Sequence, residues 1–284
     1  MKEAKHYTKL QNSKVKCQLC PHKCRLSEGA TGICNSRKNI GGKLYAMNYG
    51  KVAVISHDPI EKKPIYHFHP GTQTLSIGTT GCNFRCKFCQ NWKVAQSPYK
   101  TIDVTSEQIV NTALKEGSMG IAYTFTESLM WYEFVLDTAK LAHSKGLKNI
   151  LVTNGYVELE PLEELLDYID AANVDLKGFT DKFYKGFCGG RLEPVKKAIE
   201  VFNKKCHLEL TTLLIPGEND SPEEIEEMVD WIAGVNPEIP LHLARYYPNY
   251  KLDLPQTPIE TMNEAYEIAS KKLKYVHINN TEEG

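Results

Sequence analysis

Short apolar runs recur along most of the chain and are separated by stretches with helical periodicity. From about residue 72 onward, runs of strand length occupy residues 74–78, 120–125, 148–153, 171–177, 207–215 and 240–246. Most of these runs are apolar over much of their length rather than strictly alternating, as is typical of strands covered on both faces. The pattern predicts six buried strands with helices between them.

The helical stretches carry signals for their ends. Three residue pairs have the spacing of a capping box: Thr105 with Gln108, Ser221 with Glu224, and Thr257 with Glu260. We expect Pro222 and Pro258 at the first position of their helices, and left-handed caps at Gly117 and Gly146, which follow apolar helical stripes.

Six repeats of strand and helix predict an α/β fold with a parallel sheet and right-handed crossovers. Six units are too few for a closed eight-stranded barrel. From the pattern alone, a partial barrel and a doubly wound sheet both remain open.

Residues 1–71 have a different pattern. They contain a cysteine cluster, a Gly41-Gly42 turn and two short strand-like runs at 43–49 and 51–56, on either side of Gly50. We interpret residues 1–71 as a small cysteine-rich metal module with a hairpin and a connector. Residues 72–250 form the barrel, and 251–284 add a helix and a strand that pack on it.

The charge balance excludes some partners. The chain has 34 Lys and Arg against 35 Asp and Glu, which gives no electrostatic reason to expect nucleic acid or an anionic membrane. The N-terminus lacks the apolar core of an export signal, and no apolar run is long enough to span a bilayer. We expect a cytoplasmic protein.

Nine cysteines are unusual for such a protein, and seven of them fall in two clusters. In the reducing cytosol, clustered cysteines bind metals or take part in redox chemistry more often than they form disulfides. We interpret the two isolated residues, Cys188 and Cys206, as ordinary partly buried thiols.

One cluster, Cys82, Cys86 and Cys89, directly follows the first barrel strand in a C-x3-C-x2-C pattern. Three thiolates on a short loop suit a 4Fe–4S cluster with one iron left open, whereas clusters used only for electron transfer usually have four cysteine ligands. Zinc is the alternative, although zinc sites favour paired C-x2-C knuckles. The cysteine loop follows a strand, where the active sites of parallel barrels are found, and this position favours a catalytic role for the bound metal.

This loop, with Phe88 before its last cysteine, resembles the motif of the radical S-adenosylmethionine (SAM) superfamily. Further segments are similar in order and spacing to pyruvate formate-lyase activating enzymes: TNGYV (153–157), VDLKG (174–178) and LIPGENDSPEE (214–224). The fuller pattern resembles the radical enzyme of the AmmeMemoRadiSam system, through CQLCPHKC (17–24), IEKKPIYHFHPGT (60–72), CQNW (89–92) and YTFTES (123–128).

The resemblance implies a partial (β/α)6 barrel and a radical mechanism. A 4Fe–4S cluster on Cys82, Cys86 and Cys89 would hold SAM at its open iron. A reduced flavodoxin- or ferredoxin-type donor would supply one electron, which cleaves SAM to methionine and a 5′-deoxyadenosyl radical. That radical would remove hydrogen from an unidentified small-molecule or protein substrate.

The resemblance also implies residues that contact the cofactor: Phe88, Thr126, Glu127, Thr153, Asn154, Asp175 and Lys177. Glu127 takes the place of the family's partner for the methionine ammonium, with an ordinary helix-start carboxylate as the alternative. For Asp175 and Lys177 the alternative is a structural salt bridge.

Two positions depart from the family pattern. Val152 stands where activating enzymes have Asp. Their late-strand histidine has no clear counterpart among His242, Arg245, Tyr246 and Tyr247.

The N-terminal cluster, Cys17, Cys20, Cys24 and Cys34, has the pattern C-x2-C-x3-C-x9-C. Four such ligands close a tetrahedral zinc site or hold a second 4Fe–4S cluster, which would act as an electron relay. Pro21 and the short reach favour zinc, but the spacing does not decide. His67 and His69 share one face if the connector is extended, and we do not assign them as ligands.

Three functions follow from these observations. The first is a radical SAM enzyme of the AmmeMemoRadiSam system. The second is an activating enzyme that forms a glycyl radical on a large partner, and the third is a non-catalytic iron–sulfur or zinc binding protein.

Overall fold

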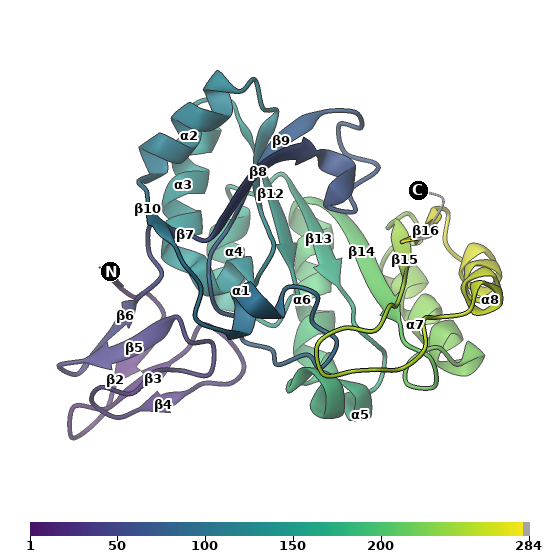
Figure 1. Cartoon of the computed structure of the whole chain (residues 1–284), viewed down its shortest axis with the longest axis horizontal. Coiled ribbons are helices and arrows are strands. Elements are labelled where there is room, and N and C mark those ends of the chain that lie inside the picture. The colour runs from purple at the N-terminus through teal and green to yellow at the C-terminus, as the bar shows by residue number, and fades with distance from the viewer. Residues whose placement is uncertain (281–284) are drawn as a thin grey trace.

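The computed structural model describes residues 1–280, and its centre is one eight-stranded sheet (Figure 1). Seven strands are parallel: β9 (Gln73–Gly78), β11 (Gly120–Tyr123), β12 (Lys148–Thr153), β13 (Ala171–Asp175), β14 (His207–Leu214), β15 (Leu241–Arg245) and β16 (Val276–Asn279). β8 (Val54–Pro59) pairs antiparallel with β9 at one edge. The six strands expected from the apolar runs are all present.

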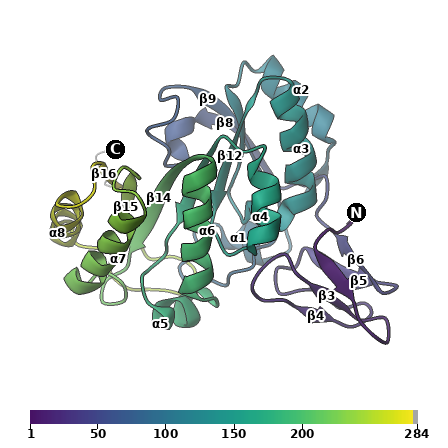
Figure 2. The same cartoon turned by 180° about the vertical axis from the view of Figure 1, so that it is seen from behind.

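The helices pack against one face of this sheet, as the view from behind in Figure 2 shows. The long ones are α2 (Ser106–Lys115), α3 (Tyr132–Ser144), α4 (Leu159–Leu166), α6 (Leu192–Lys205), α7 (Pro222–Val235) and α8 (Ile259–Ser270). Two short ones, α1 (Trp92–Gln96) and α5 (Asp181–Phe183), lie near the carboxyl ends of the strands. A π-helical turn, Tyr184–Cys188, follows α5.

The strand order decides between the two architectures that the sequence leaves open. The parallel strands follow one another in chain order from β9 to β16, without the reversal that defines a doubly wound sheet. Successive right-handed crossovers then place the long helices on the same face. Within residues 1–280 the two edge strands, β8 and β16, do not pair with each other, so the sheet is a partial barrel.

The predicted helix ends are mostly confirmed. Thr105 forms a full capping box with Gln108, and Ser221 caps α7 with Pro222 in its first turn. Gly117 and Gly146 have φ of 64° and 78°.

The third capping box is wrong. Helix α8 begins at Ile259 with Pro258 as its cap residue. The hydroxyl of Thr257 instead donates to the carbonyl of Leu214 at 2.6 Å and accepts from the N–H of Tyr246. The Thr257 hydroxyl therefore forms hydrogen bonds with other elements and does not cap the helix.

Short antiparallel sheets form the N-terminal part. One contains β1 (Lys2–Glu3), β5 (Arg37–Ile40) and β6 (Lys43–Ala46), and another β2 (Tyr7–Lys9), β3 (Val15–Cys17) and β4 (Arg25–Leu26). β7 (Lys51–Val52) pairs with β10 (Ile102–Asp103). Gly41 and Gly42, with φ of 62° and 72°, turn β5 into β6 as expected. A hairpin of the runs on either side of Gly50 is wrong, because β6 pairs with β1 and β5, whereas β7 pairs with β10 and β8 with β9.

The connector fills the amino-terminal end of the barrel. It contains a 3-10 turn, Ile60–Lys62, and buries Ile60 and Ile65 against apolar side chains of the neighbouring strands. This packing leaves the other end of the barrel, where the strands finish, as the place for a site.

Candidate active site

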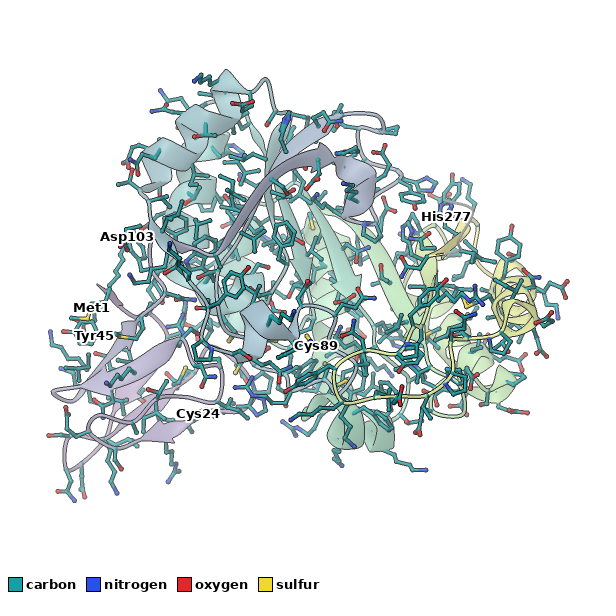
Figure 3. The ribbon with its side chains drawn as sticks, viewed as in Figure 1. Met1, Cys24, Tyr45, Cys89, Asp103 and His277 are labelled. Atoms are coloured by element: carbon teal, nitrogen blue, oxygen red, sulfur yellow. The ribbon has the colours of Figure 1, made fainter. Side chains whose placement is uncertain are left out.

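The three cysteines of the second cluster lie on the loop between β9 and α1, at the carboxyl ends of the strands. Figure 3 labels Cys89, which lies beside α1. All three line one cavity of about 360 Å³. The ends of β11, β12 and β13 contribute further polar residues to this cavity, as expected for a parallel barrel.

The thiols have surroundings that suit metal binding. The Sγ of Cys82 accepts from the N–H of Phe84 at 3.3 Å and lies 3.8 Å from the Nδ2 of Asn154. Burial raises the pKa of the Cys82 and Cys89 thiols. Buried thiols of this kind become thiolates when a metal supplies the compensating positive charge.

Cys86 has a neighbour that the sequence did not reveal. Its thiol hydrogen-bonds to that of Cys188, and this contact, followed by burial, raises the pKa of Cys86. The N–H of Arg85 donates to the carbonyl of Cys188 at 2.7 Å, and that of Lys87 to Phe187 at 3.0 Å. Cys188 is fully buried beside the loop and is therefore part of the site's surroundings.

In residues 1–280, no three cysteine, histidine or carboxylate side chains already converge as they would around a bound metal ion. Cys82, Cys86 and Cys89 nevertheless line the same cavity. The donor set and the cavity fit an iron–sulfur cluster, and the sulfurs must draw together to hold it.

Glu127 lies at the centre of a buried hydrogen-bond network. Its carboxylate accepts from the Thr153 hydroxyl at 2.6 Å, the Asn154 N–H at 2.8 Å and the Leu129 N–H at 3.1 Å. Burial nevertheless raises the pKa of Glu127 to about 7. A carboxylate that is 2 % exposed and lines a cavity is well placed to bind a cationic group.

The loop that carries Glu127 is bound to the cysteine loop. The hydroxyl of Thr126 donates to the carbonyl of Thr79 at 2.9 Å. Phe125 has φ of 68°, an uncommon conformation for a non-glycine residue, and a Cβ on Gly78 would lie 3.0 Å from its side chain. The two loops therefore form one unit.

Asp175 and Lys177 form an ion pair of 2.9 Å at the end of β13, and both line the cavity. Burial opposes the charge of Lys177, but Asp175 and the neighbouring thiols raise its pKa. The ammonium also lies 6.0 Å from the centre of the Phe88 ring. The pair thus exists as the salt-bridge alternative requires, and it also faces the site.

The remaining wall of the cavity comes from residues that the sequence did not single out. They are Thr211, Leu213, Ala244, Asn279, Asn280, Lys62 and Pro64. Thr211 could have been found, because it lies opposite Asp175 in the register of β13 with β14. Asn279 comes from a strand outside the six repeats and left no comparable signal, whereas Lys62 and Pro64 lie in the segment 60–72 that carries part of the family resemblance.

None of the four late-strand candidates lines this cavity. Arg245 and Tyr246 are buried and hydrogen-bonded to Thr257, and Tyr247 donates to the carbonyl of Asn280. His242 lies toward the other end of the barrel, where its Nε2 is 2.6 Å from Glu209. Val152, the departure from the family pattern, does line the cavity.

Glu209 organises the amino-terminal end of the barrel. This buried carboxylate binds the rings of His207 and His242 and accepts from the N–H groups of Tyr66 and His67 in the connector. His67 Nε2 also lies 2.8 Å from His277 Nε2. Connector and sheet are thus joined through one carboxylate.

The four N-terminal cysteines lie close together. Cys17, Cys20 and Cys34 are buried and Cys24 is partly exposed, with the N–H of Cys17 donating to the carbonyl of Cys24 at 2.9 Å. Burial raises the pKa of Cys17 and Cys20, and the neighbouring thiols add to this. Their chemistry fits a bound metal, as the spacing predicts.

Arg37 links this cluster to the barrel. It is buried and pairs with Glu133 on α3 through two hydrogen bonds of 3.0 and 2.8 Å. Its Nε has no hydrogen-bond partner within residues 1–280. Arg37 also lies near Cys17 and Cys34, where a donor of this kind suits thiolate sulfurs.

The N-terminal part also contacts the cysteine loop directly. His22 Nε2 lies 2.9 Å from the carbonyl oxygen of Asn83, and the Arg85 guanidinium donates to the carbonyl of Ile33. A Cβ on Gly81 would lie 2.5 Å from the Cys34 carbonyl oxygen. The two cysteine clusters are therefore carried by segments in contact.

A partial barrel with three cysteines after its first strand defines a class of enzymes. Residues 76–232 match the radical SAM superfamily, and the chain belongs to it. It is therefore an enzyme, and membership implies a 4Fe–4S cluster and SAM.

Over 99% of its length the chain is 44% identical to an uncharacterized protein of Methanocaldococcus jannaschii, of which it covers 85%. It is also homologous to activating enzymes. It is 26% identical to the pyruvate formate-lyase-activating enzyme of Clostridium pasteurianum, over 69% of this chain and 87% of that enzyme.

Solved structures share the fold. A radical SAM methyltransferase from Sphaerobacter thermophilus matches 76% of this chain and 68% of its own, with a TM-score of 0.59 and 16% identity. A domain of a pyruvate-formate lyase-activating enzyme from Bacteroides vulgatus matches 57% of this chain and 99% of its own, with a TM-score of 0.50 and 21% identity. Separately, no helix among residues 1–280 has the length and apolar character needed to cross a bilayer.

Proposed function

We propose that this enzyme binds a 4Fe–4S cluster through Cys82, Cys86 and Cys89 and cleaves SAM reductively to start radical chemistry on a substrate. The observation that carries the proposal is the shared cavity, which is lined by the three cysteines together with Glu127 and residues at the ends of the next two strands. When bound, such a cluster supplies one electron that cleaves the S–C5′ bond of SAM to methionine and a 5′-deoxyadenosyl radical.

The residues of the cavity have separate roles in this proposal. Glu127 accepts hydrogen bonds from the methionine ammonium, while Thr153 and the Asn154 N–H hold its carboxylate in place. Asn154 also orients Cys82, because its Nδ2 donates to the Oδ1 of Asn83 and contacts the Sγ of Cys82.

Other residues contact the rest of SAM and keep water out. Thr126, Asp175 and Lys177 present polar groups to the cofactor, and Phe88 covers the loop from one side. Enclosure matters because a primary carbon radical removes hydrogen from any C–H or S–H group that comes next to it.

The substrate then occupies the far wall of the cavity, beside Thr211, Ala244 and Asn279. The resemblance of residues 17–24, 60–72 and 123–128 supports a place in the AmmeMemoRadiSam system. Homology to activating enzymes supports the alternative, formation of a glycyl radical on a partner enzyme. The electron donor in either case is a reduced flavodoxin or ferredoxin.

A second metal, either zinc or a further 4Fe–4S cluster, is bound by Cys17, Cys20, Cys24 and Cys34 in this proposal. Support comes from their burial and from the free donor of Arg37 beside them. The metal and sulfide contents of the wild type and of a variant lacking Cys17 and Cys20 distinguish the two options. If the site binds zinc, the variant should contain less zinc and the same amount of iron. If it binds a cluster, the variant should contain less iron and less sulfide.

The test of the central proposal is anaerobic reconstitution with iron and sulfide, followed by reduction in the presence of SAM. We expect formation of 5′-deoxyadenosine and methionine in equal amounts. Cys86→Ala should abolish this cleavage and leave the fold largely intact. Cys206→Ala, which removes an isolated thiol next to Phe202, is the matched control and should retain it. Retained cleavage in Cys86→Ala would refute the assignment.

A further inference from the structure

A segment near the C-terminal end lies across the cysteine-loop side of the barrel. Residues 246–258, which we call the strap, run from β15 to α8, and Figure 1 shows them to the right of α1 and above α5. The N–H of Lys251 donates to the carbonyl of Lys87 at 2.9 Å. The rings of Trp92 and Tyr250 stack with centroids 5.0 Å apart. Strap and cysteine loop therefore form one continuous surface.

Three exposed lysines lie on this surface, each above an aromatic ring. The ammonium of Lys87 lies 4.8 Å from the centre of Phe187, that of Lys93 lies 5.8 Å from Trp92, and that of Lys251 lies 5.0 Å from Tyr250. Among the residues that the structure describes, no carboxylate comes within 4 Å of any of these three ammonium groups. We call Lys87, Trp92, Lys93, Tyr250 and Lys251 the loop–strap surface.

The arrangement of these charges indicates the kind of partner. The ammonium groups lie over separate rings and do not converge on one point, so they do not form a pocket for a small anion. The whole chain has a net charge of −1, so this surface is a local excess of positive charge, with Asp253 the acidic residue of the strap. The rings of Trp92, Phe187 and Tyr250 are half-buried, and half-buried aromatic rings with exposed cations above them are typical of protein interfaces.

The surface also lies next to the site that must be reduced. Lys87 stands between Cys86 and Cys89 in the chain, and Trp92 follows Cys89 by three residues. Cys89 is only half-buried. A protein bound here is therefore as near to the three cysteines as the loop allows.

We propose that the loop–strap surface docks an acidic one-electron carrier protein, which reduces the site beneath it. The inference rests on the proposed function and adds where the donor binds and which residues attract it. Electrostatic attraction of this kind raises the rate of association and is weakened by salt.

The test compares two reductants with the reconstituted enzyme. The triple variant Lys87→Gln/Lys93→Gln/Lys251→Gln should be reduced by a recombinant acidic flavodoxin roughly tenfold more slowly than the wild type at low salt. Its rate should also lose most of the salt dependence that the wild type shows. With dithionite, which needs no docking, both proteins should form 5′-deoxyadenosine at the same rate.

The matched control replaces three exposed lysines at the other end of the barrel, Lys115, Lys145 and Lys271, by Gln. It removes the same charge, so it should retain the wild-type rate with flavodoxin. Carbodiimide, which joins an amine to a touching carboxylate, should link flavodoxin to Lys87, Lys93 or Lys251, as mapped by mass spectrometry. This second readout needs no turnover and therefore separates docking from the proposed function.

The proposal would be overturned if flavodoxin reduced the triple variant at the wild-type rate, or if it cross-linked only to lysines elsewhere. Equal losses with flavodoxin and dithionite would also overturn it, because the lysines would then act on the loop itself. A wild-type enzyme that cross-links as expected but forms no 5′-deoxyadenosine with either reductant would refute the proposed function and leave the docking surface supported. Links to another acidic protein in preference to flavodoxin would identify a substrate site instead.

Discussion

The hydroxyl of Thr153 donates to the carboxylate of Glu127 at 2.6 Å, so the end of β12 is bound to the loop after β11 by a buried hydrogen bond. The contact fixes one carboxylate oxygen in the cavity. We predict that Glu127→Gln weakens SAM binding by about tenfold or more, because a charge-assisted hydrogen bond to the ammonium becomes a neutral one. Thr153→Val should weaken it less, since the carboxylate remains and loses only its orientation. Titration calorimetry with SAM on the reconstituted protein measures both, and equal affinities in all three proteins would exclude Glu127 as the ammonium partner.

Substitution of Cys188 tests whether one iron of the cluster has no protein ligand. Cys188→Ala should keep the iron and sulfide content of the wild type, because only Cys82, Cys86 and Cys89 act as ligands in our proposal. The loss of a buried sulfur should lower the free energy of unfolding by roughly 1 kcal/mol. Iron analysis and electron paramagnetic resonance of the reduced protein are the measurements. A variant that loses iron as Cys86→Ala does would make Cys188 a fourth ligand, and SAM would then have no free iron to bind.

Glu209 predicts how acid affects stability. Burial alone would raise its pKa, but hydrogen bonds from His207, His242 and the connector N–H groups lower it to about 2. A carboxyl group whose pKa is lower in the folded than in the unfolded state stabilises the fold above its unfolded pKa, near 4.5. This contribution, roughly 3 kcal/mol, should disappear as the pH falls from about 5 to about 2.

Urea unfolding at several pH values measures the effect. Glu209→Gln should be less stable than the wild type at pH 7, and the difference should shrink as the pH falls through that window. Glu267→Gln, an exposed substitution on α8, is the control and should follow the wild type. A constant difference between pH 7 and pH 3 would mean that Glu209 acts through packing alone.

The buried pair of Arg37 and Glu133 joins the N-terminal part to α3. Arg37→Met should lower the free energy of unfolding by about 3–5 kcal/mol, because it leaves a buried carboxylate without its partner. The double variant Arg37→Met/Glu133→Gln should recover much of this loss, since it removes the unpaired charge. Chemical unfolding of the wild type, the two single variants Arg37→Met and Glu133→Gln, and the double variant gives the coupling energy. Additive losses would show that the two side chains do not act as a pair.

Gly81 is where the two cysteine-bearing segments touch. It has φ of 97°, and an added Cβ would lie 2.5 Å from the carbonyl oxygen of Cys34. Gly81→Ala should therefore separate the loop from the N-terminal part and lower iron retention. Gly71→Ala is the control, because Gly71 has a similar φ of 79° but open space around it. It should cost only about 1–2 kcal/mol of backbone strain and retain iron. Equal effects would show that strain, and not the contact, matters at Gly81.

Much of the barrel could be predicted from the sequence, because each apolar run had to become a strand covered on both faces. The order of the strands could not, since the periodicity is the same in a partial barrel and a doubly wound sheet. β8 and β16 were harder still: they are edge strands with half-exposed residues, and β8 looks like part of a hairpin until its pairing with β9 is known.

The site divides in the same way. Cys82, Cys86, Cys89 and Glu127 stand in local patterns that carry their own chemistry, and they do line one cavity. Cys188 has no such pattern, because its position beside Cys86 depends on how a π-helical turn packs against the loop. Thr257 does not cap its helix for a related reason: a carbonyl far away in the sequence, that of Leu214, accepts the hydrogen bond from its hydroxyl.

The connector also forms part of the wall of the cavity. Lys62 and Pro64 contribute to the cavity wall from a turn, and no strand ladder runs through either residue. Replacing them alters the shape and charge of the chamber while every backbone pairing of the sheet stays intact. Substitutions in this short stretch can therefore change which substrate the cavity binds without breaking the hydrogen bonds of the sheet.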